Sequence, residues 1–274
     1  MTTHLVTFSD ESMSRARELC VSSALVCGID QVWPWCKEAI EHWGIAERHS
    51  RVFRQPDDAR RAWAWWAWKP LIINRHLREL FDGEIVVYAD AGVEFINNVS
   101  HIIDRMGHVK PQDDIWIFGN NWEHAHWCKR DVIEVVWPLF RSAEPAKPEN
   151  LFEDSFTWSR FRKQVQASVI FFRVSDYTRA FVKEWLDRCL FEGGRLIDDS
   201  PSRLPNHPEF QEHRHDQAIL TTMAYREGIK LHYWPAQYND GAFNYEKLPC
   251  YAGDDYPILF HHHRRRNHEW ENAA

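Results

Sequence analysis

This chain of 274 residues lacks the apolar segments that membrane and secreted proteins carry. No apolar run approaches the roughly 20 residues that a membrane-spanning helix needs. The N-terminus, MTTHLVTFSD, does not have the layout of a secretory signal peptide either. We therefore expect no transmembrane segment and a cytoplasmic protein, either free or bound peripherally at the inner membrane.

An excess of positive charge and a glycine-rich phosphate loop are also absent. The formal net charge is −7, which argues against non-specific nucleic-acid binding as the main task, so no nucleic-acid partner is expected. Neither G-x-G-x-x-G nor G-x-x-x-x-G-K occurs in the sequence. A dinucleotide site of the usual kind and a P-loop are therefore disfavoured.

Glycine is scarce, whereas tryptophan is abundant. The 6 cysteines are scattered without a C-x-x-C pair, which predicts reduced core thiols rather than a metal cluster or a disulfide framework. With 11 glycines, 13 prolines and 44% hydrophobic residues, the composition is that of a globular protein. The 15 tryptophans suit sugar binding by stacking, although we expect most of them in the core.

Strand-like and helix-like patterns alternate along the chain, which is typical of an α/β fold. Short apolar runs ending in polar residues predict the strands, and 3.6-residue periodicity predicts the helices. Strands are expected at 4–10, 85–90, 115–119 and 167–174; helices at 13–27, 62–81 with an interruption near Pro70, 130–136, 176–191 and 216–228; and irregular segments at 46–62, 141–154 and 198–210.

The strand GEIVVYAD ends on a carboxylate, Asp90, followed directly by Ala91 and Gly92. A charge at this position lies at the carboxyl edge of the sheet, where open α/β folds bind ligands. The small residues after it allow a phosphate or a metal to approach the backbone. The alternative is that Asp90 only caps the following turn, and this segment alone supports both interpretations equally.

Two clusters further along the chain are rich in titratable groups. In EHRHDQ (212–217), Asp216 at a helix start is stabilised as the anion by the helix dipole. A capping role would explain Asp216 but not the four polar residues around it. The second cluster, HHHRRR (261–266), is read either as an imidazole metal ligand with arginines for phosphate oxygens or as a solvated basic tail; a tag remnant is a third reading.

These motifs together resemble those of GT-A-fold glycosyltransferases, in particular the bacterial and viral sugar transferases with a W-x-W-K-P helix, a Y-x-D-A-G strand end and an H-R-H-D-Q motif. A more distant similarity is to retaining galactosyltransferases related to glycogenin. The resemblance spans roughly residues 4–265. The matching residues are Trp66, Trp68, Lys69 and Pro70; Tyr88, Asp90, Ala91 and Gly92; Gln166 and Ala167; His213, Arg214, His215, Asp216 and Gln217; and His262.

The resemblance implies an α/β fold with a single GT-A (Rossmann-like) domain over 1–274. Its central sheet would be mostly parallel and flanked by helices, with the C-terminal segment 251–274 closing over the donor site. It also implies catalytic roles for Asp216, which would hold sugar hydroxyls, and Gln217, beside the anomeric carbon. The donor-binding residues that it implies are Thr7, Phe8, Ser9, Lys69, Asp90, Ala91, Gly92, Gln166, Ala167 and His215.

A divalent cofactor, Mn²⁺ or Mg²⁺, is implied at Asp90 and His262. Relatives commonly have a second Asp two residues after the first, and here that position is Gly92. Either Glu94 or His262 then supplies the missing ligand, or the enzyme depends little on metal. Mn²⁺ accepts imidazole as well as oxygen ligands, which is compatible with His262.

The function implied is transfer of a sugar from a nucleotide-diphosphate donor to a glycan or polysaccharide acceptor, with retention at the anomeric carbon the expected outcome. A retaining route needs no dedicated base, whereas an inverting one would use Asp216. Two rivals remain: a non-catalytic carbohydrate-binding protein with tryptophan platforms, and a metal-dependent hydrolase built on the histidines. Candidate acceptor residues, equally readable as a surface loop, are Glu123, Trp127, Lys129 and Asp131.

Overall fold

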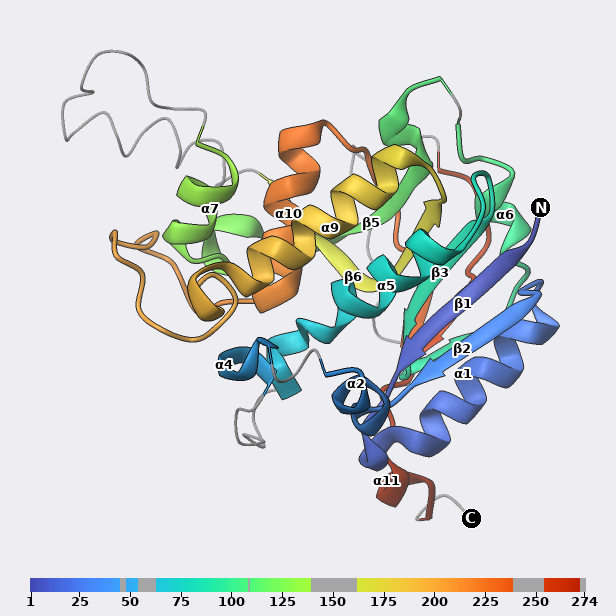
Figure 1. Cartoon of the computed structure of the whole chain (residues 1–274). Helices are drawn as coiled ribbons and strands as arrows, with labels where there is room; N and C mark the ends of the chain where they lie inside the picture. The colour runs from blue at the N-terminus through green and yellow to red at the C-terminus, as the bar shows by residue number, and fades with distance from the viewer. Residues whose placement is uncertain (45–47, 54–62, 108, 139–161, 239–253, 272–274) are drawn as a thin grey trace.

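The computed structural model describes residues 1–44, 48–53, 63–107, 109–138, 162–238 and 254–271. A six-stranded sheet forms its centre (Figure 1). β6 runs antiparallel to both its neighbours, and the other described pairs of this sheet are parallel, which confirms the prediction of a mostly parallel sheet. In spatial order the strands are β2 (Gln31–Trp35), β1 (Thr3–Phe8), β3 (Ile85–Asp90), β6 (Lys163–Arg173), β5 (Ile115–Glu123) and β7 (Leu231–His232).

Both faces of the sheet are buried, because side chains that alternate along each strand enter two separate cores. On β3, Val86 and Tyr88 pack into one core, whereas Val87 and Ala89 pack into the other. The first core lies under α5 (Trp68–Glu79), α7 (Arg130–Val136), α9 (Asp176–Leu190) and α10 (His215–Glu227). The second lies under α1 (Ser14–Val26), α6 (Ser100–Ile103) and a small sheet of β4 (Val93–Phe95), β9 (Phe260–His262) and β8 (Ala236–Tyr238).

The expected helix at 62–81 is broken, but the break precedes Pro70. A 3-10 turn, Trp63–Trp66, is followed by α5, which begins at Trp68. Pro70 therefore lies in the first turn of α5, where a missing N–H costs no intrahelical hydrogen bond. The consequence is that Lys69 sits at the start of a helix whose residues 68–73 are all buried.

One other expectation needs correction, and another lies outside the described residues. Part of the expected surface loop 46–62 forms α4 (Ser50–Phe53), and Val52 and Phe53 are buried. The buried face of α1 consists of Ala16, Cys20 and Ala24, whereas the larger side chains of Leu25 and Val26 are exposed. The expected loop 141–154 is outside the described residues.

The other expected helices and strands lie close to their predicted positions, whereas β2, β4, β7, β8 and β9 were not predicted. β5 and β6 are longer than predicted, and the segment 198–214 has neither helix nor strand. The described cysteines carry free thiols. No helix among the described residues is long and apolar enough to cross a bilayer. The short helices α2 (Lys37–His42) and α11 (Asn267–Glu271) complete the described helices.

Candidate functional site

Three motifs that are far apart in the sequence meet at one edge of the central sheet. Phe8, at the end of β1, pairs in register with Asp90 at the end of β3. β6 runs the opposite way, with Val169 opposite Ala89, so the start of β6 lies where the parallel strands end. Gln166 and Ala167 are thereby brought beside Asp90. This is the carboxyl edge at which α/β sheets bind ligands.

A cavity of about 480 Å³ opens at this edge. Its volume falls within the range of small-molecule sites. It contains the N-terminal residues of α10 and part of the C-terminal segment as well as the strand ends. The lining residues are Phe8, Ser9, Asp10, Met13, Trp63, Trp66, Trp68, Lys69, Asp90, Ala91, Gly92, Trp122, Gln166, Ala167, Ser168, Arg214, His215, Asp216, Gln217, His262, Arg264 and Arg266.

The charged centre of the cavity is a carboxylate–ammonium–carboxylate arrangement. Nζ of Lys69 lies 3.3 Å from Oδ1 of Asp90 and 3.3 Å from Oδ2 of Asp216, and it donates a hydrogen bond to the carbonyl of Ala167 at 2.9 Å. The hydroxyl of Tyr88 donates to Oδ1 of Asp90 at 2.6 Å. Lys69 was expected among the donor-binding residues; the structure places its ammonium between the two aspartates, where it holds them in one site.

These charges shift one another's pKa values. Burial works against the charge on Asp90, but the Lys69 ammonium and the Tyr88 hydrogen bond outweigh it and lower the pKa of Asp90. Burial likewise opposes the charge on Lys69, and the two carboxylates raise its pKa above the ordinary value. Asp90 and Lys69 are therefore both charged at neutral pH.

Asp216 behaves differently, because burial raises its pKa to about 6, with Lys69 lowering it and Asp90 raising it. Since this pKa is higher in the folded than in the unfolded chain, the contribution of Asp216 to the free energy of unfolding is fully present below pH 4. It is lost as pH rises through about 6. A shift of this size corresponds to about 3 kcal/mol.

We expect urea denaturation of Asp216→Asn to remove this pH dependence. Subtracting the variant's free energy of unfolding from the wild-type value should give a difference that falls between about pH 4 and pH 7. A difference that stays flat over this range would contradict the raised pKa.

In the H-R-H-D-Q motif, only His213 lies outside the cavity, and the four residues that follow it line the cavity. His213 is buried and donates from Nε2 to the carbonyl of Leu196 at 2.8 Å, so its role is structural. Arg214 faces the cavity, with its guanidinium 4.5 Å from the ring centre of Trp122. His215 donates from Nδ1 to the carbonyl of Ile197 at 2.7 Å and stacks on Trp66. The structure thus separates one structural residue from the cavity-lining residues of this motif.

Two glutamines line the cavity with oriented amides. Nε2 of Gln217 donates to Oε1 of Gln164 at 2.6 Å, and its Oε1 lies 3.5 Å from the backbone nitrogen of Ala167. Nε2 of Gln166 donates to Ser168 Oγ at 2.9 Å. These contacts fix the side-chain orientation of both residues beside Asp216.

Asp90 and His262 fit the expected metal ligands in chemistry, but two protein ligands do not complete a coordination shell. Burial, followed by the charge of Arg264, lowers the pKa of His262 to about 3, so its imidazole is neutral, as a metal ligand must be. Nδ1 of His262 is buried and has no hydrogen-bond partner among the described residues, while Nε2 accepts from Nε of Arg264 at 3.1 Å. Cations of the Mg²⁺ type take few protein ligands and complete their shell with phosphate oxygens and water.

Several predicted residues do not line the cavity. Thr7 is fully buried beneath the strand end, so its expected role in donor binding stays a prediction. Glu94 pairs with His261 at 3.0 Å, on the small sheet. Lys129 is buried and bonded to Asp198 at 3.2 Å, so at this residue the structure shows neither an exposed acceptor contact nor a surface loop. The other predicted members of that loop, Glu123, Trp127 and Asp131, do not line the cavity either.

Sequence reasoning did not single out Trp63 and Trp122, although both line the cavity. Trp122 is 39% exposed and stacks on Trp127, with 4.9 Å between ring centres. Trp63 lies next to Phe8, whose ring also stacks on Trp68 with 4.0 Å between centres. In the sequence, only the high tryptophan content indicated that tryptophan rings could line the cavity.

Three non-glycine residues of the cavity wall have left-handed backbones: Trp66 with φ 65°, His215 with φ 49° and Arg264 with φ 53°. Such conformations cost energy for residues with a Cβ atom, and they concentrate at functional sites. They come from three separate segments of the chain. The structure around the cavity therefore keeps all three residues in backbone conformations that they would not favour on their own.

Comparison with known proteins identifies the fold. Neither a protein-family model nor a curated protein matches the sequence. Among solved structures, the galactosyltransferase LgtC in complex with donor and acceptor sugar analogues aligns over 96% of this chain and 87% of its own, with a TM-score of 0.51 and 10% identity. Mouse xyloside xylosyltransferase 1 aligns over 96% of this chain and 97% of its own, with a TM-score of 0.47 and 10% identity. The likeness to LgtC confirms the fold prediction: this chain has the fold of GT-A glycosyltransferases.

Proposed function

We propose that this protein is a glycosyltransferase that uses a nucleotide-diphosphate sugar. One observation carries the proposal: in a GT-A fold, a single cavity at the carboxyl edge of the sheet gathers Asp90, Lys69, Asp216 and Gln217 with tryptophan rings and arginines. Nothing in this set resembles the three converging ligands and open position of a catalytic zinc hydrolase. LgtC, which shares the fold, is a galactosyltransferase.

The cavity has complementary charges for the two ends of such a donor. Arg264 and Arg266, from the C-terminal segment of the chain, line the cavity. Guanidinium groups bind phosphate oxygens with two parallel hydrogen bonds. Asp90 and Asp216 lie on either side of Lys69, where their oxygens can accept hydrogen bonds from sugar hydroxyls. The donor would thus lie with its diphosphate toward the arginines and its sugar toward α10.

The residues around Asp216 would stabilise positive charge that develops at the anomeric carbon. The carboxylate of Asp216 is buried, so its field is little screened by water. An oxocarbenium-like transition state is therefore stabilised more than the neutral ground state. A divalent ion held by Asp90 and His262, if bound with the donor, would neutralise the departing diphosphate.

The proposal also includes three finer points: retention at the anomeric carbon, a glycan or polysaccharide acceptor, and a cytoplasmic site of action. Asp216 directly precedes Gln217 on α10, and both line the cavity. If the reaction inverts configuration, Asp216 is the base. If it retains configuration, the leaving phosphate takes the acceptor's proton, and Asp216 stays ionised throughout.

A melting-temperature panel with UDP, GDP, dTDP, CMP and ADP, each with and without Mn²⁺, tests the proposal. A ligand that binds only the folded chain at ~100 times its dissociation constant stabilises by about 2.7 kcal/mol, which corresponds to a shift of roughly 5–10 °C. We expect one nucleoside diphosphate to give this shift, and Mn²⁺ to increase it.

The other outcomes of the panel are equally informative. The same shift without Mn²⁺ would assign the diphosphate to the arginines alone. No shift with any nucleotide, together with a shift on adding oligosaccharides, would replace the proposal with the non-catalytic carbohydrate-binding reading. In that case the tryptophans would be platforms and the two aspartates would have no catalytic role.

A further inference from the structure

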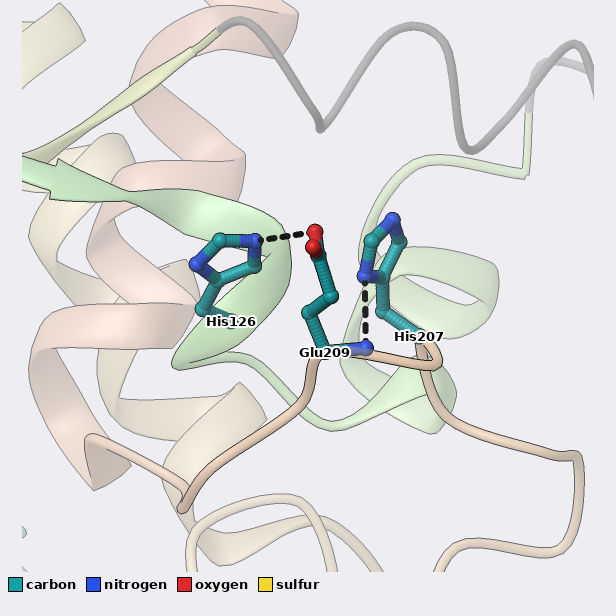
Figure 2. Close-up of side chains that lie close together, drawn as sticks. All are labelled: His126, His207 and Glu209. Atoms are coloured by element: carbon teal, nitrogen blue, oxygen red, sulfur yellow. Dashed lines mark hydrogen bonds and ion pairs between the residues drawn. The ribbon is translucent and has the colours of Figure 1, made fainter.

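A second group of polar side chains lies outside the cavity, where the end of β5 meets the irregular segment before α10. His126 ends the 3-10 turn His124–His126, and His207 and Glu209 belong to the segment 198–214 (Figure 2). One ligand-type atom from each residue lies within 4.8 Å of those from the other two. Among the described residues, no other group of three histidine, cysteine or acidic side chains meets this spacing.

The charges around His126 favour a cation. Its Nε2 lies 3.0 Å from Oε2 of Glu209 and 3.5 Å from Oε2 of Glu123. A protonated imidazole places one positive charge against these two carboxylates, whereas a divalent ion on the neutral imidazole balances both. Lys163, at 3.8 Å from Glu123, offsets part of the remaining negative charge.

The orientation of His207 is also set locally. Its Nδ1 accepts the backbone N–H of Glu209 at 3.1 Å, and Figure 2 shows the ring beside the Glu209 carboxylate. Binding a metal to this ring replaces that hydrogen bond or moves the ring proton between its two nitrogens. This rearrangement predicts an affinity lower than that of a fully preformed structural site.

From this geometry we infer that His126, His207 and Glu209 form a binding site for a transition-metal ion of the Zn²⁺ type, with Glu123 as the fourth protein ligand. Two imidazoles with carboxylate oxygens are a donor set that Zn²⁺ binds in tetrahedral geometry, whereas Mg²⁺ and Ca²⁺ prefer oxygen alone. The side chain of Glu209 is 62% exposed, so the ion can enter from solvent.

The position of this site gives the ion a structural role. The backbone N–H of Gln211 donates to the carbonyl of His126 at 2.8 Å, and that of Arg214 donates to Trp127 at 3.0 Å. These two bonds already join the segments that supply the ligands. An ion between them adds a third link close to Arg214, which lines the cavity. The proposed ion thus stabilises the position of the segment 198–214, which leads into α10.

Calorimetric titration of the full chain with Zn²⁺, after treatment with a chelator, tests the inference. We expect one Zn²⁺ per chain, and at least about tenfold weaker binding in both His126→Gln and His207→Gln. His101→Gln, on α6, is the matched control and should bind Zn²⁺ like the wild type. Melting curves in the chelator show whether each variant folds.

Cobalt substitution gives a readout independent of enzymatic activity. Co²⁺ in a tetrahedral site should give visible absorption bands that His207→Gln weakens and His262→Gln leaves intact. Zn²⁺ binding that survives in both His126→Gln and His207→Gln but disappears in His262→Gln would place the ion at the cavity and overturn the inference. The absence of stoichiometric Zn²⁺ binding would overturn it as well, and would leave His126 and Glu209 as an ion pair.

Discussion

Replacing Lys69 with methionine is expected to reduce the free energy of unfolding by about 3–5 kcal/mol at neutral pH. The substitution keeps an unbranched side chain, one atom shorter, but leaves the carboxylates of Asp90 and Asp216, each 3.3 Å from the ammonium, without their shared counter-charge. It also removes the donor to the carbonyl of Ala167. Urea denaturation of the variant and the wild type measures the loss.

Lys183→Met is the matched control for this experiment. Lys183 forms an ion pair with Asp187 at 2.6 Å, but its side chain is 62% exposed, so its loss should change stability by less than about 1 kcal/mol. The deficit of Lys69→Met should shrink at acidic pH, because the unpaired carboxylates can then take up protons. Adding Asp216→Asn should also restore part of it. A Lys69→Met variant as stable as Lys183→Met would show that the ammonium does not bind the two aspartates together.

Asp90→Asn is expected to lower the transfer rate by roughly 10²–10³-fold, the cost typical of losing one preorganised electrostatic contact to a reacting group. The variant should remain folded, because the asparagine carbonyl can still accept from Tyr88 and because Lys69 keeps Asp216 as its partner. The measurement is turnover of the donor identified by the nucleotide panel, together with the melting temperature.

The Glu94→Gln variant is the control that distinguishes the role of Asp90 from that of the nearby carboxylate of Glu94. Glu94 follows Asp90 by four residues but pairs with His261 and does not line the cavity. We therefore expect its substitution to leave turnover close to the wild-type value. Normal turnover in Asp90→Asn would refute the proposed function. Equal losses in the two variants would instead indicate that both carboxylates act through the stability of the segment that joins β3 to β4.

The sequence was sufficient to predict the strand that ends at Asp90, because its apolar run is short and ends on a charged residue. It also predicted α10 with Asp216 in the first turn and Gly228 after its end. Both predictions rest on local patterns, which a sequence records directly. The expectation that Asp90, Gln166 and Asp216 belong to one site came from the family resemblance, and the structure brings all three to the same cavity.

The features that the sequence did not predict depend on non-local packing. The inner face of α1 uses Ala16, Cys20 and Ala24, so small residues mark the close approach of a helix that hydrophobicity alone would orient differently. The location of Lys69 between two aspartates requires that α5 begin at Trp68, which the left-handed residues before it determine. No periodic pattern encodes either feature.

Gly92 limits how this cavity can be redesigned. A Cβ atom at that position would lie 2.8 Å from Cα of Arg264, and the Gly92 carbonyl accepts the backbone N–H groups of both His263 and Arg264. A second aspartate therefore cannot be introduced there by a single substitution, because the backbone that carries Arg264 already occupies the space. Any engineered or evolutionary route to a two-aspartate centre must first move the chain around residue 264, and with it the arginine proposed to bind the diphosphate.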